Sequence, residues 1–180
     1  MKKLKPSTAI AHLLSNWVSP SYIMLVGPPA VGKSTFLSKF LKEIHEKFYI
    51  ASTDDLVERE AARLRLTYSE AFNKCNQKSL KREMEDGIEK AILTRTNVIH
   101  DQTNMGRKSR AGKLKSVPES YNRICLNFTV DDRVLQQRLD ERAKLTGKVI
   151  PPSVMKNMFD SYNAPLKDEG FDLIIEVDNT

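Results

Sequence analysis

A phosphate-binding pattern near the N-terminus is the clearest chemical feature of the sequence. Residues 27–34 read GPPAVGKS and fit the pattern GxxxxGK followed by Ser or Thr without a mismatch. Glycines in such a loop let backbone amides turn inward around an anion, and Lys33 is placed to reach the β- and γ-phosphates of ATP. The hydroxyl of Ser34 is suited to bind Mg²⁺. A chance match is the alternative, but the strand predicted before the loop and the helix predicted after it favour a phosphate site. The residues that we expect to bind ATP are Gly27, Pro28, Pro29, Ala30, Val31, Gly32, Lys33, Ser34 and Thr35.

Two carboxylates follow the second predicted strand, residues 48–52. Asp54 at this strand end would lie beside the γ-phosphate, where it could accept the proton of an attacking hydroxyl group. The simpler alternative is structural: Thr53 or Asp54 caps the next helix, and Asp55 complements the helix dipole. Beside a phosphate-binding loop we favour Asp54 as a general base.

A third acidic residue, Asp101, ends an apolar segment over residues 97–101 that we expect to be a strand. Its carboxylate could orient the groups around Mg²⁺ or hold a basic side chain of the site. An aspartate that forms a turn at a strand end is the alternative. We interpret the neighbouring His100 as a packed strand residue.

Arginines before a glycine-containing turn indicate a lid over the phosphates. Arg138 and Arg142 are four residues apart and share one face of a predicted helix, which leads into LTGK at residues 145–148. Arginines there could neutralise the charge that develops during phosphoryl transfer. Ordinary surface pairing with Asp140 or Glu141 is the alternative.

Basic residues also gather after the third predicted strand, and the whole chain is basic. The formal net charge is +6, which favours polyanionic partners such as nucleic acid, although it could serve solubility alone. The cluster is either a nucleic-acid track or a solvated helix face. Its members are Arg107, Lys108, Arg110, Lys113 and Lys115.

Strands alternate with helices along the chain, which predicts an α/β fold of the P-loop NTPase type: a doubly wound, mostly parallel sheet with helices on both faces. Ligands of such sheets bind beyond the carboxyl ends of the strands, where the residues described above lie. The predicted strands cover residues 22–26, 48–52, 97–101, 123–129 and 171–177, and the predicted helices cover residues 33–46, 55–66, 69–93, 107–116, 132–144 and 152–162.

The composition is that of an ordinary globular protein. At 180 residues the chain suits one domain, and it has no apolar run of about 18 residues that could span a membrane. Cys75 and Cys125 lie in unrelated segments without metal-binding spacing, which favours a reduced, cytoplasmic protein.

In its landmarks the chain resembles the kinase domain of phage-type polynucleotide 5′-hydroxyl kinases. The resemblance covers residues 22–162 and leaves residues 1–20 outside. We therefore expect residues 1–20 to be an N-terminal helical extension and residues 21–180 to be a P-loop kinase domain. The landmarks are GPPAVGKST at 27–35, STDD at 52–55, HDQTN at 100–104 with Arg107 and Arg110, and the segment from Arg138 to Met158.

The resemblance implies roles for individual residues. Lys33 and Ser34 would hold the phosphates and Mg²⁺. Asp54 would activate the acceptor hydroxyl with support from Asp101, and one lid arginine would supply positive charge. The residues expected to be catalytic are Asp54, Lys33, Arg142, Arg138 and Asp101.

Two departures from the family concern the acceptor side. In the family an arginine three residues after the base contacts the acceptor phosphate, whereas this chain has Val57 there; Arg59 or Arg63 would have to substitute. An extra residue lies within residues 101–104. The residues expected to bind the acceptor are Asp54, Asp55, Arg59, Arg63, Thr103, Asn104 and Arg107.

The function expected from this resemblance is transfer of the γ-phosphate of ATP, with Mg²⁺, to the 5′-hydroxyl end of DNA or RNA, as in nucleic-acid repair in a phage-infected host cell. Alternative acceptors are a hydroxymethylated base in DNA, a nucleotide or a small metabolite. A non-catalytic nucleotide-binding module is the alternative from another class, but it has no need of a base at Asp54. The expected partner is nucleic acid rather than a membrane, and a homo-oligomer remains open.

Overall fold

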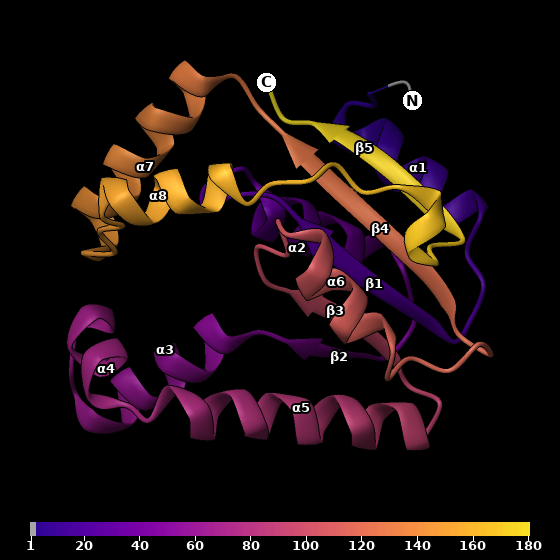
Figure 1. Ribbon diagram of the computed structural model, residues 1–180, viewed down its shortest axis with the longest axis horizontal. Helices are drawn as coiled ribbons and strands as arrows, with labels where there is room; N and C mark the ends of the chain where they lie inside the picture. Colours follow the sequence, from indigo (N-terminus) through magenta and orange to yellow (C-terminus); the bar gives the residue numbers. More distant parts are fainter. Residues whose placement is uncertain (1–2) are drawn as a thin grey trace.

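Five parallel strands form one sheet in the computed structural model, which describes residues 3–180 (Figure 1). The strand order is β2–β3–β1–β4–β5, and each neighbouring pair runs parallel. This order confirms the predicted doubly wound α/β fold of the P-loop type. The strands are β1 (Ser21–Val26), β2 (Phe48–Ala51), β3 (Asn97–Asp101), β4 (Asn122–Thr129) and β5 (Leu173–Asp178).

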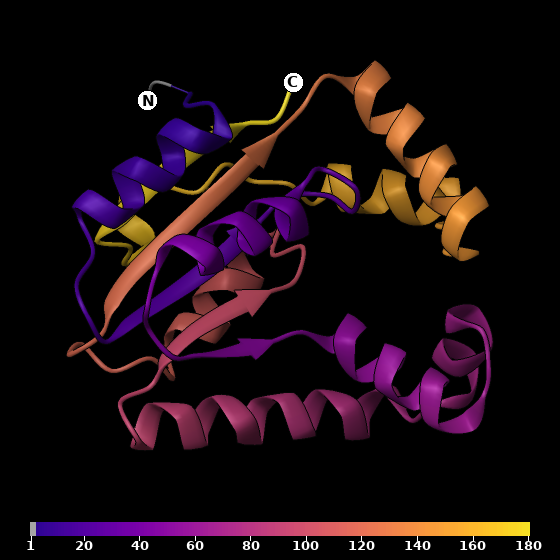
Figure 2. The same ribbon diagram turned by 180° about the vertical axis from the view of Figure 1, so that it is seen from behind.

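Helices cover both faces of the sheet, which Figures 1 and 2 show from opposite sides. One face packs against α1 and α2, and the other packs against α5 and α6. The remaining α-helices, α3, α4, α7 and α8, extend beyond the carboxyl ends of the strands (Figure 1). None of the helices in residues 3–180 is long and apolar enough to cross a membrane. They are α1 (Pro6–Ser15), α2 (Lys33–Glu43), α3 (Thr53–Leu64), α4 (Tyr68–Lys74), α5 (Gln77–Leu93), α6 (Arg107–Leu114), α7 (Asp132–Thr146), α8 (Pro152–Asp160) and a short 3₁₀ helix, η1 (Lys167–Glu169).

The central strand β1 is buried on both sides, as its continuous apolar sequence predicts. Side chains of a strand alternate between the two faces of a sheet. Ile23 and Leu25 therefore join the core beneath α1 and α2, whereas Met24 and Val26 join the core beneath α5 and α6. Because both faces of β1 are buried, the position of its last residue, Val26, is fixed, and so is the start of the phosphate-binding loop at Gly27.

The single long helix predicted over residues 69–93 is wrong, because the chain forms α4 and α5 with a break at Cys75 and Asn76. The side-chain oxygen of Asn76 accepts hydrogen bonds from the amides of Lys78 and Ser79 at 3.1 and 3.2 Å. An asparagine that satisfies the free amides of a helix start favours a new helix over continuation of the old one. The break allows α4 to pack against α3 beyond the sheet.

The N-terminal helix α1 shares its core with the sheet. Ile10 and Leu13 are buried in the cluster that also contains the apolar face of α2. Leu4 forms a parallel bridge with Val177 of β5. Residues 1 and 2 of the expected extension lie outside the described residues, and the division of the chain at residue 20 stays a prediction.

Candidate active site

The phosphate-binding loop joins β1 to α2 at the carboxyl edge of the sheet. Gly27 and Gly32 have φ angles of +146° and +102°, which residues with a side chain rarely adopt. A Cβ on Gly32 would also lie 2.7 Å from Nδ2 of Asn179. Lys33 folds back over the loop, and its Nζ donates to the carbonyl oxygens of Gly27 and Pro28 at 2.9 and 2.8 Å. The lysine therefore lies over the loop, and the glycines of such a loop allow backbone amides to turn towards an anion.

Two neighbouring segments support this loop. The carbonyl oxygen of Thr103 accepts a hydrogen bond from the first amide of the loop at 2.9 Å, and Nδ2 of Asn104 donates to the carbonyl oxygen of Leu25 at 2.7 Å. We expected Thr103 and Asn104 to bind the acceptor, but Asn104 is only 3% exposed and contacts β1 instead. Asn179 donates to the carbonyl oxygen of Val31 at 2.7 Å. The sequence offered no motif that could single out Asn179.

Charged groups surround Lys33. Burial lowers the pKa of Lys33 to about 8, while Asp101 and Asp54 raise this pKa and Arg142 lowers it further. Burial also raises the pKa of Asp101, an effect that the positive charge of Lys33 partly offsets. The structure therefore brings four of the residues that we expected to be catalytic within electrostatic reach of one another.

Asp54 lies in the first turn of α3 with its side chain about half exposed (54%). The helix cap is Ser52, whose Oγ accepts a hydrogen bond from the amide of Asp55 at 3.2 Å. Asp54 is therefore not the helix cap, and its carboxylate has other partners. Its Oδ1 accepts a hydrogen bond from the Tyr68 hydroxyl at 2.8 Å, and its Oδ2 lies 3.5 Å from Nη2 of Arg142.

The two arginines of α7 have different partners. Arg142 lies beside Asp54, whereas Nη2 of Arg138 donates to the carbonyl oxygen of Asn179 at 3.0 Å. Nη1 of Arg138 is buried without a hydrogen-bond partner in the described part of the chain. Only Arg142 of this pair therefore reaches the proposed base, and Arg138 lies against the C-terminal segment that supports the phosphate-binding loop.

The turn between α7 and α8 touches α3 and α4. Lys148 forms an ion pair with Glu58, and its Nζ lies 4.0 Å from the centre of the Tyr68 ring. The Ser69 hydroxyl donates to the carbonyl oxygen of Gly147 at 3.1 Å. Sequence reasoning identified the lid turn but missed the partners of the lid on α3 and α4, because those residues belong to no motif.

The basic residues of α3 that we expected near the acceptor have acidic partners elsewhere. Arg59 pairs with Glu83 of α5 at 2.5 Å, and Arg63 pairs with Glu60 at 2.8 Å. Neither pair includes Asp54. Our expectation that one of these arginines replaces the missing acceptor arginine therefore gains no support from their contacts.

The basic cluster after β3 is not one surface track. Arg110 is completely buried and pairs with Glu169 at 2.7 Å, and Lys113 is partly buried with its Nζ donating into the loop after β3. Arg107 is exposed but pairs with Asp168 at 3.0 Å. The reading of this cluster as either a track or a solvated face is thus wrong for Arg110 and Lys113, because their hydrogen-bond partners lie inside the fold.

A buried hydrogen-bond chain runs behind the site and contains His100. The Tyr22 hydroxyl donates to Nδ1 of His100, whose Nε2 donates to Oε1 of Gln102 at 3.1 Å. Nε2 of Gln102 in turn donates to Oγ1 of Thr53 at 3.2 Å, next to Asp54. Burial lowers the pKa of His100 to about 3, so the imidazole is neutral. His100 is therefore packed, as expected, and it links β1 and β3 to the start of α3.

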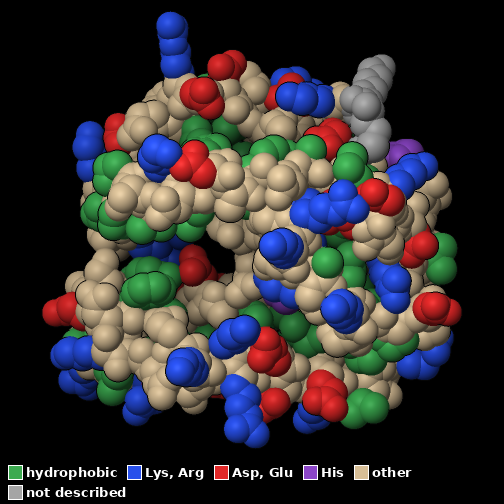
Figure 3. All heavy atoms as spheres, in the orientation of Figure 1, with side chains coloured by type: hydrophobic (Ala, Val, Ile, Leu, Met, Phe, Trp, Pro, Cys, Tyr) green, Lys and Arg blue, Asp and Glu red, His purple; other side chains and the backbone are tan. Residues whose placement is uncertain are grey.

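A hollow opens between the lid and the α3–α4 region, as Figure 3 shows. Acidic and basic side chains lie within it, and apolar side chains lie on both of its rims. Asp54, Arg142 and Lys148 come from the elements on its two sides. The hollow is therefore where a second substrate could approach the proposed base.

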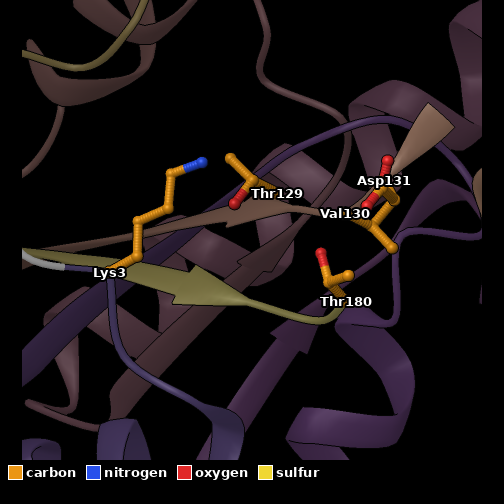
Figure 4. Close-up of a pocket in the computed structure, with 5 residues that line it drawn as sticks. All are labelled: Lys3, Thr129, Val130, Asp131 and Thr180. Atoms are coloured by element: carbon orange, nitrogen blue, oxygen red, sulfur yellow. The ribbon is translucent and has the colours of Figure 1, made fainter.

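A second cavity of about 260 Å³ lies at the ends of β4 and β5 (Figure 4). In Figure 4 the side chain of Lys3 extends towards Thr129. The hydroxyl of Thr129 has no hydrogen-bond partner among residues 3–180. The amide of Asn179 donates to the carbonyl oxygen of Thr129 at 2.9 Å, so this cavity borders the segment that supports the phosphate-binding loop. Its lining residues are Lys3, Thr129, Val130, Asp131 and Thr180.

The fold and the phosphate-binding loop together define an ATP-binding protein of the P-loop kinase class. The AAA_33 family model, described as an AAA domain, matches residues 23–165, and the chain belongs to this family.

Proteins with different acceptors are similar to this chain. It is 30% identical over 162 residues to the L-seryl-tRNA(Sec) kinase of Methanococcus maripaludis, across 88% of this chain but only 59% of the length of that kinase. A chain in the structure of the Pnkp1/Rnl/Hen1 RNA repair complex is 24% identical with a TM-score of 0.61, over 82% of this chain and 46% of that one. A gluconokinase from Sinorhizobium meliloti 1021 is 16% identical with a TM-score of 0.53, over 90% and 84% of the two chains. The two solved structures support the fold alone.

Proposed function

We propose that this chain is a kinase that transfers the γ-phosphate of ATP to a hydroxyl group carried by nucleic acid, and foremost to the 5′-hydroxyl end of DNA or RNA. The observation that carries the proposal is the position of Asp54. Its carboxylate is half exposed after β2, 3.5 Å from Arg142 and 4.0 Å from Lys148, and its charge acts on Lys33. A protein that only binds ATP has no need of such a carboxylate.

The reaction follows from this geometry. The acceptor hydroxyl oxygen attacks the γ-phosphorus, its proton passes to the carboxylate of Asp54, and the bond from the γ-phosphorus to the bridging oxygen of ADP breaks. Lys33 and Arg142 offset the negative charge of the transferred group. Since this transition state is loose, positioning and electrostatics supply most of the rate.

The oxygen donors beside the loop fit Mg²⁺. Ser34 and Thr35 are exposed where α2 begins, and Asp101 ends the neighbouring strand β3. Mg²⁺ binds few protein oxygens and keeps water and phosphate oxygens as its other ligands. We infer that Ser34 would hold the ion, which would neutralise phosphate charge when bound.

Two observations favour nucleic acid over a small acceptor. The net charge of +6 suits a polyanion. Among the similar proteins, the relative at 30% identity is named for a seryl-tRNA substrate. A small hydroxylated metabolite remains the alternative, because a gluconokinase shares the fold.

A second candidate acceptor is the seryl hydroxyl of a charged tRNA. Val57 occupies the position at which the 5′-hydroxyl kinases have their acceptor arginine, and it is 1% exposed within the α3–α4–α5 core. A buried valine cannot contact an acceptor phosphate, so this position offers no observation that favours the 5′ end over another hydroxyl group of nucleic acid. The 30% identity to a seryl-tRNA kinase favours the second candidate.

The deciding experiment measures transfer of labelled γ-phosphate from Mg²⁺-ATP to three acceptors: 5′-hydroxyl oligonucleotides, the same oligonucleotides already bearing a 5′-phosphate, and seryl-tRNA. Asp54→Asn is run alongside, with Asp86→Asn on the exposed face of α5 as its matched control. We expect labelling of the 5′-hydroxyl ends alone, loss of transfer in Asp54→Asn, and unchanged binding of ATP in both variants.

Other outcomes separate the candidates. Labelled seryl-tRNA with unlabelled oligonucleotides would replace the 5′-end proposal by the second candidate. Full activity of Asp54→Asn would remove the assigned base whatever the acceptor. Binding of ATP without transfer to any of the three would overturn the nucleic-acid proposal.

A further inference from the structure

Two aromatic side chains of α4 form a pair, and one of them, Tyr68, contacts the proposed base. Tyr68 and Phe72 lie four residues apart on α4, with ring centroids 6.1 Å apart and ring planes inclined by only 27°. Phe72 is 46% exposed. Together they form a nearly parallel aromatic pair in which the ring of Phe72 is exposed to solvent.

Tyr68 ties this pair to the site. Its hydroxyl donates to Oδ1 of Asp54 at 2.8 Å, and the ammonium group of Lys148 lies 4.0 Å from its ring centre. Both contacts restrain the ring, since a hydrogen-bonded hydroxyl and a cation over a ring each prefer one geometry. Phe72 is therefore linked to Asp54 through Tyr68, whose ring these contacts hold in place.

The packing of α4 does not account for the exposed ring. Ala71 and the ring of Tyr68 pack against the cluster of Val57, Ala61 and Leu80, which joins α4 to α3 and α5. Phe72 is not part of that cluster. Its ring contacts the ring of Tyr68 and stays about half exposed instead of lying within the core.

We propose that Phe72, supported by Tyr68, stacks on the terminal nucleobase of the acceptor and so brings the hydroxyl group of the terminal nucleotide to Asp54. The inference rests on the proposed function in requiring a nucleic-acid acceptor. Every nucleobase has a π-face, so stacking on an aromatic ring tolerates any sequence, as a kinase of nucleic-acid ends requires. Arg142 and Lys148 supply positive charge on the same side, where the backbone phosphates of the acceptor would pass.

The kinetic test compares Phe72→Ala with the unaltered protein on 5′-hydroxyl oligonucleotides whose first nucleotide is either intact or abasic. Base–aromatic stacking corresponds to about a 5- to 150-fold change in affinity. We expect Phe72→Ala to raise KM for the intact acceptor within this range and to leave KM for the abasic acceptor and for ATP unchanged. Leu93→Ala, at an exposed position that ends α5, is the matched control.

A binding measurement keeps the inference separate from the transfer reaction. In Phe72→Trp the new indole should be quenched by intact oligonucleotides more than by abasic ones, without ATP. The native Trp17 packs against Phe40 and Phe48 in the core and provides a constant background that the unaltered protein measures directly.

The outcomes are distinct. Unchanged KM in Phe72→Ala, or an equal rise for intact and abasic acceptors, overturns the stacking site even where 5′ ends are phosphorylated. If no oligonucleotide is phosphorylated, the proposed reaction is wrong. Stronger quenching by intact than by abasic ends would still support the stacking site in that case. Equal quenching by both overturns it.

Discussion

At the residue scale, two arginines on one face of α7 have different partners in the folded protein. Arg138 and Arg142 share a face of α7, and the sequence offers no reason to prefer either as the lid charge. Their environments differ because α7 runs outward from the end of β4. Arg138 therefore stays against Asn179, and Arg142 reaches Asp54.

We predict that Arg142→Ala lowers kcat by about 10²–10³, the usual cost of removing a group that stabilises transition-state charge. Arg138→Ala should reduce kcat far less and should weaken ATP binding, since its partner Asn179 supports the loop. Steady-state kinetics with both variants, and with Arg133→Ala at an exposed position of the same helix, provide the comparison. Equal losses of kcat in the Arg138 and Arg142 variants would contradict the assignment.

A buried ion pair joins elements that are far apart in the chain. The side chains of Arg110 on α6 and Glu169 on η1 are 0% and 1% exposed. Nη1 of Arg110 also donates to the carbonyl oxygens of Asn104 and Met105 at 3.1 and 2.9 Å. The pair therefore connects the segment before β5 to the loop that supports the phosphate-binding site.

Removing one partner of this pair should destabilise the fold strongly. Arg110→Met is expected to lower the free energy of unfolding by about 3–5 kcal/mol, because Glu169 would remain buried without its partner. The double variant with Glu169→Met should recover a large part of this loss. Denaturant titration measures both, with the exposed Lys108→Met as control. A double variant that is no more stable than Arg110→Met would argue against an uncompensated charge as the cause.

At the scale of the whole molecule, the strand order β2–β3–β1 gathers the functional groups. The loop after β1, the carboxylate after β2 and the carboxylate that ends β3 come from adjacent strands and meet at one edge. The buried chain from Tyr22 through His100 to Gln102 links β1 and β3 to the start of α3 beneath that edge. This chain requires a neutral imidazole in the folded molecule.

Folding stability should therefore fall in acid partly through His100. Burial lowers the pKa of this side chain from 6.5 to about 3, so below pH 6.5 the unfolded chain binds a proton that the folded chain excludes. The contribution of neutral His100 to the free energy of unfolding is fully present above pH 6.5. It decreases as the pH drops towards 3, by at most about 1.4 kcal/mol per pH unit. The free energy of unfolding should decline less steeply in His100→Asn over that range, although this variant is less stable at neutral pH.

His45→Asn, which alters an exposed histidine, is the control for this pH dependence. Parallel declines in His100→Asn and in the unaltered protein would show that another group causes the acid sensitivity. Asp101 titrates in both proteins and so cancels from their difference.

Local patterns predicted a large part of the fold because their physical causes are local. The apolar run of β1 and the glycines before Lys33 indicate a buried strand and a left-handed loop without reference to the rest of the chain. The break at Asn76 was missed because the surrounding residues have a continuous helical pattern, and only the hydrogen bonds of the Asn76 side chain start a new helix there. The contact between Asp54 and Tyr68 was missed, and Arg142 could not be distinguished from Arg138, because these partners of Asp54 lie 14 and 88 residues away along the chain.

The sequence by itself determined the fold class, the phosphate-binding loop and the acidic residues at the strand ends, because pattern and spacing decide where a buried strand stops and a loop begins. Only the tertiary structure decided which arginine reaches Asp54, that Arg110 is a buried ion-pair partner, and that Tyr68 contacts the proposed base. These outcomes depend on how α4, α6 and α7 pack against elements distant in the chain, and on which charges that packing removes from water.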